Sequence, residues 1–194
     1  MRLVLASSSP RRAELLERIG LVFDTTPVDI DETRRPDESP GVYVERLARE
    51  KTQALSLTES VVVGADTAVV HKGHVLGKPG HPEEARSMLR SLQGATHEVF
   101  TGVAVAHAGE IASLVDVTEV RMTPMTADEI ADYVDTGEPM DKAGSYALQG
   151  RGGLYVESIA GSPFTVIGLP LHLFPRLVAR VGGDLGMFRR RSNL

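Results

Sequence analysis

The first twenty residues constrain the fold most strongly, because they place a strand directly before a helix. An apolar run over 3–6 leads into three serines, and a helical pattern begins at Pro10. Proline suits the first position of a helix, Ser9 is a favourable N-cap, and Gly20 can end the helix. We therefore expect a strand, a short loop and a helix within this segment.

The first turn of that helix carries two arginines, Arg11 and Arg12. A helix N-terminus has a partial positive charge, so acidic side chains are the usual occupants of a first turn. An external anion such as a phosphate would offset the repulsion and bind to the exposed backbone N–H groups. A solvated basic patch on an ordinary strand, loop and helix explains the same residues, and the pattern alone leaves both interpretations open.

Strand and helix patterns continue to alternate along the chain, which is typical of α/β proteins. Helical patterns occupy 42–57, 82–92, 126–136 and 170–181, and strand patterns occupy 61–64, 68–70, 75–76, 96–106, 111–122 and 154–159. Pro175 should kink the last helix or delay its start. We expect an α/β fold with a mixed twisted sheet flanked by helices, in one domain over 1–184, followed by a basic tail over 185–194.

Composition excludes several classes of protein. The chain has 194 residues and no cysteine, so disulfides, thiolate chemistry and cysteine-based zinc sites are excluded. A net charge of −5 argues against binding nucleic acid by broad phosphate neutralisation. No apolar run approaches the roughly 20 residues of a membrane span, and the sequence opens as a strand rather than a signal peptide. We expect a cytoplasmic protein that binds neither nucleic acid nor membranes.

Acidic residues at two places have the chemistry of a metal or proton-transfer site. Asp66 follows the valine-rich run at 61–64, and ligands of α/β proteins commonly bind just beyond the carboxyl ends of strands. A carboxylate there can ligate a metal or accept a proton from water. Asp29, Asp31 and Glu32 supply further oxygens of the kind that Mg²⁺ and Mn²⁺ prefer. Capping of a turn and an ordinary polar loop explain the same residues.

Two lysines and a glutamine complete the set of polar candidates. Lys51 lies on the second helical segment, and Lys78 is held in Gly77-Lys78-Pro79, where proline stiffens the backbone. Together with Arg11 and Arg12, they supply the cations that a metal-bound polyphosphate requires. Gln149, among glycines, can offer its amide to the edge of a base. Solvated lysines and a turn glutamine are the alternative interpretation.

Several nucleotide and hydrolase signatures are missing from the sequence. It contains no Walker P-loop, no G-x-G-x-x-G fingerprint and no nucleophile elbow. The strand patterns at 68–70 and 75–76 predict a hairpin with its turn at 71–74. His71, His74 and His81 lie close in sequence, but on this turn and a following loop rather than on one helical face. We therefore do not expect a zinc site.

Taken in order, the motifs resemble those of the Maf family of nucleoside triphosphate pyrophosphatases, over nearly the whole chain. The matching runs are Leu5-Ala-Ser-Ser-Ser-Pro-Arg-Arg12, Asp31-Glu32, Ala48-Arg-Glu-Lys51, Gly64-Ala-Asp-Thr67, Gly77-Lys-Pro79, Glu98-Val-Phe-Thr-Gly102, Asp141-Lys-Ala-Gly-Ser-Tyr146, Gln149-Gly150 and Gly168-Leu-Pro170. The resemblance implies an α/β fold like that of inosine triphosphatases, with a cleft between two lobes, in a homodimer. It also implies hydrolysis of a nucleoside triphosphate between its α and β phosphates, with Mg²⁺ or Mn²⁺.

The resemblance assigns roles to individual residues. Asp66 matches the family's proton acceptor, and Arg11, Thr67 and Gln149 match positions associated with a preference for dTTP and UTP. The residue chemistry agrees: we expect Asp66 to activate water with a metal that Asp66 and Glu32 hold. Three cationic residues, Arg12 and the catalytic candidates Lys51 and Lys78, should stabilise charge on the phosphates and on the leaving pyrophosphate. Ser7 or Ser9 should complete the phosphate site. The alternatives are a 7-methyl-GTP pyrophosphatase and a nucleotide-binding regulator of septum formation or cell division.

Overall fold

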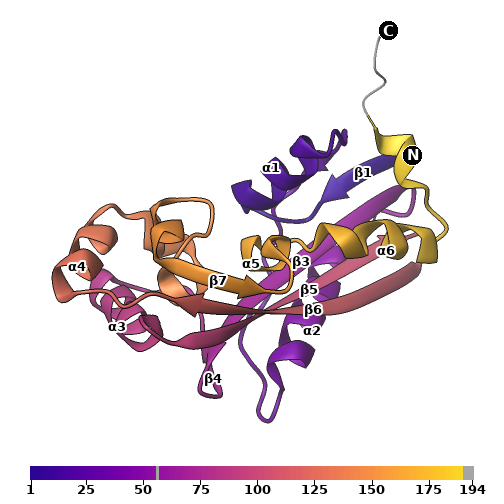
Figure 1. Cartoon of the computed structure of the whole chain (residues 1–194). Coiled ribbons are helices and arrows are strands. Elements are labelled where there is room, and N and C mark those ends of the chain that lie inside the picture. Colours follow the sequence, from indigo (N-terminus) through magenta and orange to yellow (C-terminus); the bar gives the residue numbers. More distant parts are fainter. Residues whose placement is uncertain (56, 190–194) are drawn as a thin grey trace, which may run out of the picture. The chain divides into compact units, whose positions relative to one another are not determined.

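The computed structural model describes residues 1–55 and 57–189, which form a mixed α/β fold (Figure 1). Its sheet has seven strands in the order β2-β1-β3-β5-β6-β7, with β4 paired to β3. The strands are β1 (Arg2–Leu5), β2 (Asp24–Thr25), β3 (Ser60–His71), β4 (His74–Leu76), β5 (Thr96–His107), β6 (Glu110–Met122) and β7 (Val156–Ala160). β1 runs parallel to β2 and β3, whereas β4 is antiparallel to β3 and β7 to β6. The expected mixed α/β class is confirmed.

The helices lie between the strands along the chain. The α-helices are α1 (Pro10–Arg18), α2 (Pro40–Gln53), α3 (Pro82–Leu92), α4 (Ala127–Asp135), α5 (Pro163–Ile167) and α6 (Phe174–Arg180). Short 3₁₀ helices are η1 (Glu138–Asp141), η2 (Ala143–Ser145), η3 (Arg151–Tyr155), η4 (Leu171–Leu173) and η5 (Leu185–Phe188). None of the helices in the described part of the chain has the length and apolarity to cross a membrane.

The chain divides into two compact units. Unit 1 comprises residues 1–66, 101–116 and those from 168 onward, and unit 2 comprises residues 67–100 and 117–167. In unit 1, α2 lies beside β3 and β5 (Figure 1), and two glycines permit the close approach. A Cβ on Gly64 would lie 2.5 Å from the carbonyl oxygen of Ala48, and one on Gly102 would overlap the backbone of Val44. Helix α2 therefore packs directly onto the sheet backbone.

Unit 2 has its own apolar core, in which α3 packs against α4 and η2. Its buried members are Val69, Ala85, Leu89, Leu92, Val99, Val120, Met122, Met125, Ile130, Tyr133, Val134 and Tyr146. The expected start of α4 is confirmed: the Thr126 hydroxyl accepts a hydrogen bond from the Glu129 N–H at 3.2 Å, and the Glu129 carboxylate accepts one from the Thr126 N–H at 2.7 Å. This capping box fixes where the helix begins.

The largest difference from the sequence-based expectation concerns β3. The pattern predicted one strand ending near Asp66 and another over 68–70, but β3 runs without interruption from Ser60 to His71. Gly64 is not a strand terminator: it is the point where α2 approaches the sheet, and a side chain there would meet the backbone of Ala48. Asp66 thus lies within a strand rather than beyond its carboxyl end.

Other boundaries also shift for local reasons. Helix α2 begins at Pro40, because the Ser39 hydroxyl accepts from the Val42 N–H at 3.4 Å and caps it. The Ser9 side chain makes no capping bond to α1. Pro175 lies in the first turn of α6, so the final helix starts late rather than kinking.

Part of the expected basic tail is folded in unit 1. Residues Leu185–Phe188 form η5, and the Phe188 side chain is buried. The Phe188 carbonyl accepts a hydrogen bond of 2.7 Å from the Val22 N–H, which ties this turn to the segment after α1. The rest of the expected tail, 190–194, lies outside the described residues.

Candidate active site

Two carboxylates converge on one lysine in unit 1. Lys51 lies near the end of α2, and its Nζ is 2.7 Å from Asp66 Oδ1 on β3 and 2.7 Å from Glu32 Oε1 in the β2–α2 loop. Lys51 and Asp66 are buried, whereas the Glu32 side chain is 50% exposed. A buried cation is thus paired with one buried and one accessible carboxylate, and the close approach of α2 at Gly64 permits this arrangement.

Arg12 and Ser7 belong to the same unit, and Arg12 interacts electrostatically with both carboxylates. The Arg12 Nε donates to the carbonyl of Gly168 at 2.8 Å, and its Nη1 donates to the Ser7 hydroxyl at 3.2 Å. Burial lowers the pKa of Arg12, while the charges of Asp66 and Glu32 act to raise it. The guanidinium of Arg12 therefore lies within the field of the two carboxylates, fixed by bonds to a serine and a distant carbonyl.

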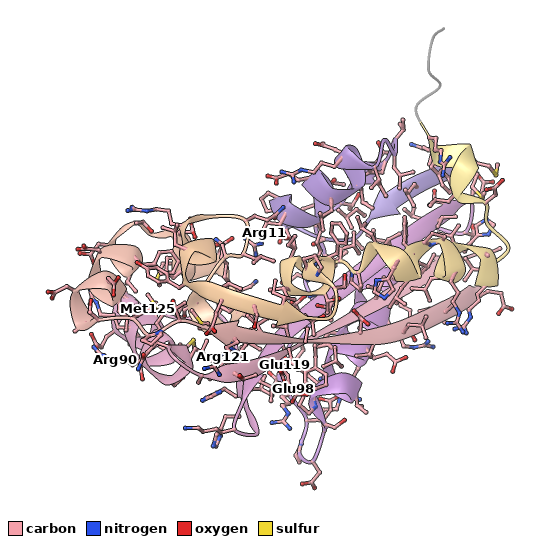
Figure 2. All side chains as sticks on the ribbon, in the orientation of Figure 1. Arg11, Arg90, Glu98, Glu119, Arg121 and Met125 are labelled. Carbon is pink, nitrogen blue, oxygen red and sulfur yellow. The ribbon has the colours of Figure 1, made fainter. Side chains whose placement is uncertain are left out.

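Ser9 and Arg11 are the other two candidates in the first loop and helix. The Ser9 N–H donates to the Ser7 hydroxyl at 3.1 Å, so Ser7 serves both Ser9 and Arg12. Arg11, labelled in Figure 2, lies half-buried in the first turn of α1. Its charge is felt by Arg12, whose pKa it helps to lower.

Lys78 and Gln149 lie in unit 2, both exposed on loops. The loop of Lys78 is tied to the segment before Gln149, because the Gly144 N–H donates to the Gly77 carbonyl at 3.1 Å. Thr67 follows Asp66 on β3, so its side chain points to the opposite face of the strand. The structure therefore gathers Ser7, Ser9, Arg12, Glu32, Lys51 and Asp66 in unit 1, and it joins the loops of Lys78 and Gln149 in unit 2.

The donor set of Asp66 and Glu32 fits a divalent cation of the Mg²⁺ type, which takes one or two carboxylates and completes its coordination with phosphate oxygens. Within residues 1–55 and 57–189, no group of three or more His, Cys, Asp or Glu side chains could hold a metal ion by itself. Asp31 does not join the pair: its Oδ1 accepts from the Thr33 N–H at 2.9 Å and stabilises a turn. A cation here would depend on a polyphosphate ligand.

Sequence analysis missed the residues that hold the Glu32 loop to α2. The Tyr43 hydroxyl donates to the Glu32 carbonyl at 2.9 Å, and Arg46 Nη2 donates to the Thr33 carbonyl at 3.1 Å. Arg46 Nε is also 2.7 Å from Glu38 Oε1, and both side chains are largely buried. No local motif marked these residues, because Glu38 and Arg46 lie eight positions apart on a loop and a helix.

Removal of the Glu38 charge should destabilise the protein in a pH-dependent way. The pKa of Glu38 is lowered to about 2, and hydrogen bonds from Arg46 are the main cause. A Glu38→Gln variant should lose roughly 3 kcal/mol at pH 7, the order expected when one partner of a buried ion pair is removed. Because the folded-state pKa lies below the usual 4.5, the wild type should lose this advantage as pH falls through about 2.

Thermal unfolding of both proteins between pH 7 and pH 2 checks this expectation. The stability difference between wild type and the variant should shrink over the acid range, because a protonated Glu38 resembles glutamine. A difference that stays constant from pH 7 to pH 2 would show that the Glu38 charge does not stabilise the loop.

Comparison with known proteins assigns the family of this chain. The model described as Maf-like protein matches residues 2–181, and the chain belongs to the Maf family. It is 51% identical to a protein of Anaeromyxobacter dehalogenans (strain 2CP-C) over 95% of this chain and 96% of that one. It is 47% identical to a protein of Pseudoalteromonas atlantica, over 92% and 96%, and 50% identical to one of Desulforamulus reducens, over 87% and 91%. Each of these relatives is named dTTP/UTP pyrophosphatase.

A solved structure is similar at a lower level. The Staphylococcus aureus Ham1 protein matches with a TM-score of 0.46 and 14% identity, over 80% of this chain and 91% of that chain.

Proposed function

We propose that this protein is a nucleoside triphosphate pyrophosphatase that hydrolyses dTTP and UTP to the monophosphate and pyrophosphate. The observation that supports it most is the convergence of Asp66 and Glu32 on Lys51, each carboxylate 2.7 Å from its Nζ. Arg12 lies in the same electrostatic field. The names of relatives at 47–51% identity support the choice of substrate.

Asp66 acts as the general base in this proposal. Its carboxylate accepts a proton from a water molecule as the water oxygen forms a bond to the α-phosphorus. The bond between the α-phosphorus and the bridging oxygen breaks, and pyrophosphate leaves with the electron pair. Lys51, which contacts Asp66 at 2.7 Å, and Arg12 stabilise the negative charge that develops on the phosphates, as does Lys78.

A divalent cation, Mg²⁺ or Mn²⁺, is held by Asp66 and Glu32 in this proposal. When bound, it supplies positive charge that offsets the charge of the triphosphate. Tyr43 and Arg46 keep the Glu32 segment in place through its backbone carbonyls. Ser7, Ser9 and nearby backbone amides complete the phosphate site.

Arg11, Thr67 and Gln149 orient the pyrimidine base in this proposal, and a glutamine amide offers both a donor and an acceptor to a base edge. We extend the proposal to a homodimer, which rests on the family resemblance, and to a cytoplasmic protein, which rests on the composition of the sequence. The net charge of −5 is in line with a protein that does not bind nucleic acid.

A nucleotide panel tests the proposal. Pyrophosphate release from dTTP, UTP, CTP, GTP and 7-methyl-GTP should be measured with and without Mg²⁺ or Mn²⁺. We expect cation-dependent cleavage, fastest for dTTP and UTP. Preference for 7-methyl-GTP would contradict the proposal that the site selects a pyrimidine nucleotide. Tight nucleotide binding without any cleavage would instead favour a regulator of cell division.

A further inference from the structure

We propose that Glu138 and Tyr133 are positioning residues for base selection, because they fold the loop that presents Gln149. This inference rests on the proposed function and deepens it. Glu138 begins η1 and Tyr133 lies on α4, so both are anchored in unit 2 ahead of the loop. Neither belongs to the phosphate-binding residues described above.

The Glu138 carboxylate is the hydrogen-bond centre of this loop. Its Oε1 accepts from the Tyr133 hydroxyl at 2.7 Å and from the Gly152 N–H at 3.1 Å, and its Oε2 accepts from the Arg151 N–H at 3.0 Å. The Tyr133 hydroxyl in turn accepts from the Ala147 N–H at 3.1 Å. The two side chains therefore hold the backbone on both sides of Gln149.

Glycines on the C-terminal side of Gln149 show how closely the loop wraps around these groups. A Cβ on Gly150 would overlap the Glu138 carboxylate, and one on Gly152 would lie 2.5 Å from the Tyr133 hydroxyl oxygen. A Cβ on Gly153 would lie 2.6 Å from the carbonyl oxygen of Leu148. Gly150 and Gly152 are thus required by contact with Glu138 and Tyr133, and Gly153 by contact with the loop's own backbone.

The negative charge of Glu138 is stabilised by the groups that the carboxylate binds in this loop. Burial works to raise the pKa of Glu138, but hydrogen bonds from Tyr133, Gly152 and Arg151 outweigh it and lower the pKa below its ordinary value. Lys142 also contacts this residue, since its Nζ donates to the Glu138 carbonyl at 2.6 Å. Glu138 is therefore an anion near pH 7, and charge-assisted hydrogen bonds to the loop are stronger than those of a neutral amide.

A consequence for selectivity follows from the exposure of Gln149. Its side chain is exposed and makes no hydrogen bond within the described part of the chain, so the place of the amide depends on the backbone that carries it. Hydrogen bonds at 147, 151 and 152 hold the backbone of Gln149 in place, so the amide reaches a limited set of positions. Preorganised polar groups discriminate between bases more strongly than mobile ones.

The test compares the ratio of kcat/KM for dTTP to that for CTP in Gln149→Ala, Glu138→Gln, Tyr133→Phe and the double variant Glu138→Gln/Gln149→Ala. We expect Gln149→Ala to lower the ratio by about tenfold, the effect of losing one hydrogen-bonding group. Glu138→Gln should lower it nearly as far and Tyr133→Phe by a smaller factor. The double variant should match Gln149→Ala, because a residue that acts through another shows no additive effect.

Glu157→Gln is a matched control in the same unit. Its carboxylate is half exposed on β7 and pairs with Arg121, labelled in Figure 2, at 2.9 Å. The ratio of kcat/KM for dTTP to that for CTP in Glu157→Gln should equal that of the wild type. Tyr133→Phe keeps the test decisive if Glu138→Gln lowers the melting temperature too far.

The outcomes separate this inference from the proposed function. If Gln149→Ala lowers the ratio while Glu138→Gln and Tyr133→Phe slow all nucleotides equally, Glu138 and Tyr133 are merely structural and the inference is overturned. If Gln149→Ala leaves the ratio unchanged while dTTP cleavage persists, the positioning inference fails but the pyrophosphatase proposal stands. If the wild type cleaves no nucleotide, the proposed function itself is wrong.

Discussion

Replacement of Asp66 by asparagine should reduce kcat for dTTP hydrolysis by roughly 10²–10⁴-fold, the range typical for loss of a general base. Asparagine keeps the size of the side chain but cannot accept the proton of the attacking water. Binding should weaken far less than turnover, because Lys51 and Arg12 keep their positive charges and the asparagine retains an amide oxygen beside Glu32 that can still ligate the cation. Single-turnover rates and titration with a non-hydrolysable α,β-methylene analogue separate the two effects.

A surface variant in the same unit provides the control. Asp24 is 62% exposed in its side chain and pairs with Arg2 at 3.8 Å, so Asp24→Asn should retain the wild-type rate. Near-normal turnover of Asp66→Asn would remove Asp66 from the role of base. A loss of binding equal to the loss of turnover would make it a residue of the phosphate site alone.

The Gly64→Ala variant should be destabilised by about 3 kcal/mol, at the upper end of the cost of overpacking. Its Cβ would lie 2.5 Å from the Ala48 carbonyl oxygen and 3.1 Å from the Lys51 Cβ, so α2 has to move away from β3. The melting temperature should fall by roughly 6–12 °C for a chain of this size. Because Lys51 moves with α2, turnover should fall as well.

Gly80→Ala is a suitable comparison, since its Cβ would meet only Glu84 Oε2, at 3.4 Å. We expect its free energy of unfolding to change by no more than about 0.5 kcal/mol, as for ordinary surface substitutions. Thermal unfolding and kcat of the two variants together test the claim. Wild-type stability in Gly64→Ala would mean that α2 does not rest on the strand backbone at this point.

Much of the fold could be predicted because its determinants are local. Helix α3 and the hairpin of β5 and β6 follow from continuous periodic patterns, and α4 follows from a capping box within four residues. The prediction that a strand ends near Gly64 was wrong. This glycine is present because its missing side chain permits α2 to approach β3, which is a tertiary contact. A glycine that ends a strand and one that lies under a helix look the same in sequence.

The site shows the same division between local and distant information. Asp66, Lys51 and Glu32 were singled out by residue type and motif, but their convergence depends on how α2 packs against β3. The supporting residues were missed: Arg46 reaches Glu38 across eight positions, and Glu138 reaches Gly152 across fourteen. Neither pair forms a local pattern, since each contact exists only after a loop has folded back.

The most direct test of the central claim is hydrolysis of dTTP in ¹⁸O-labelled water, followed by mass spectrometry of both products. Attack at the α-phosphorus places one ¹⁸O in the thymidine monophosphate and none in the pyrophosphate, which is the result that this account predicts. Label in the pyrophosphate would place the attack on the β-phosphorus. Release of thymidine diphosphate with labelled inorganic phosphate would place it on the γ-phosphorus, and either result would contradict the proposed reaction.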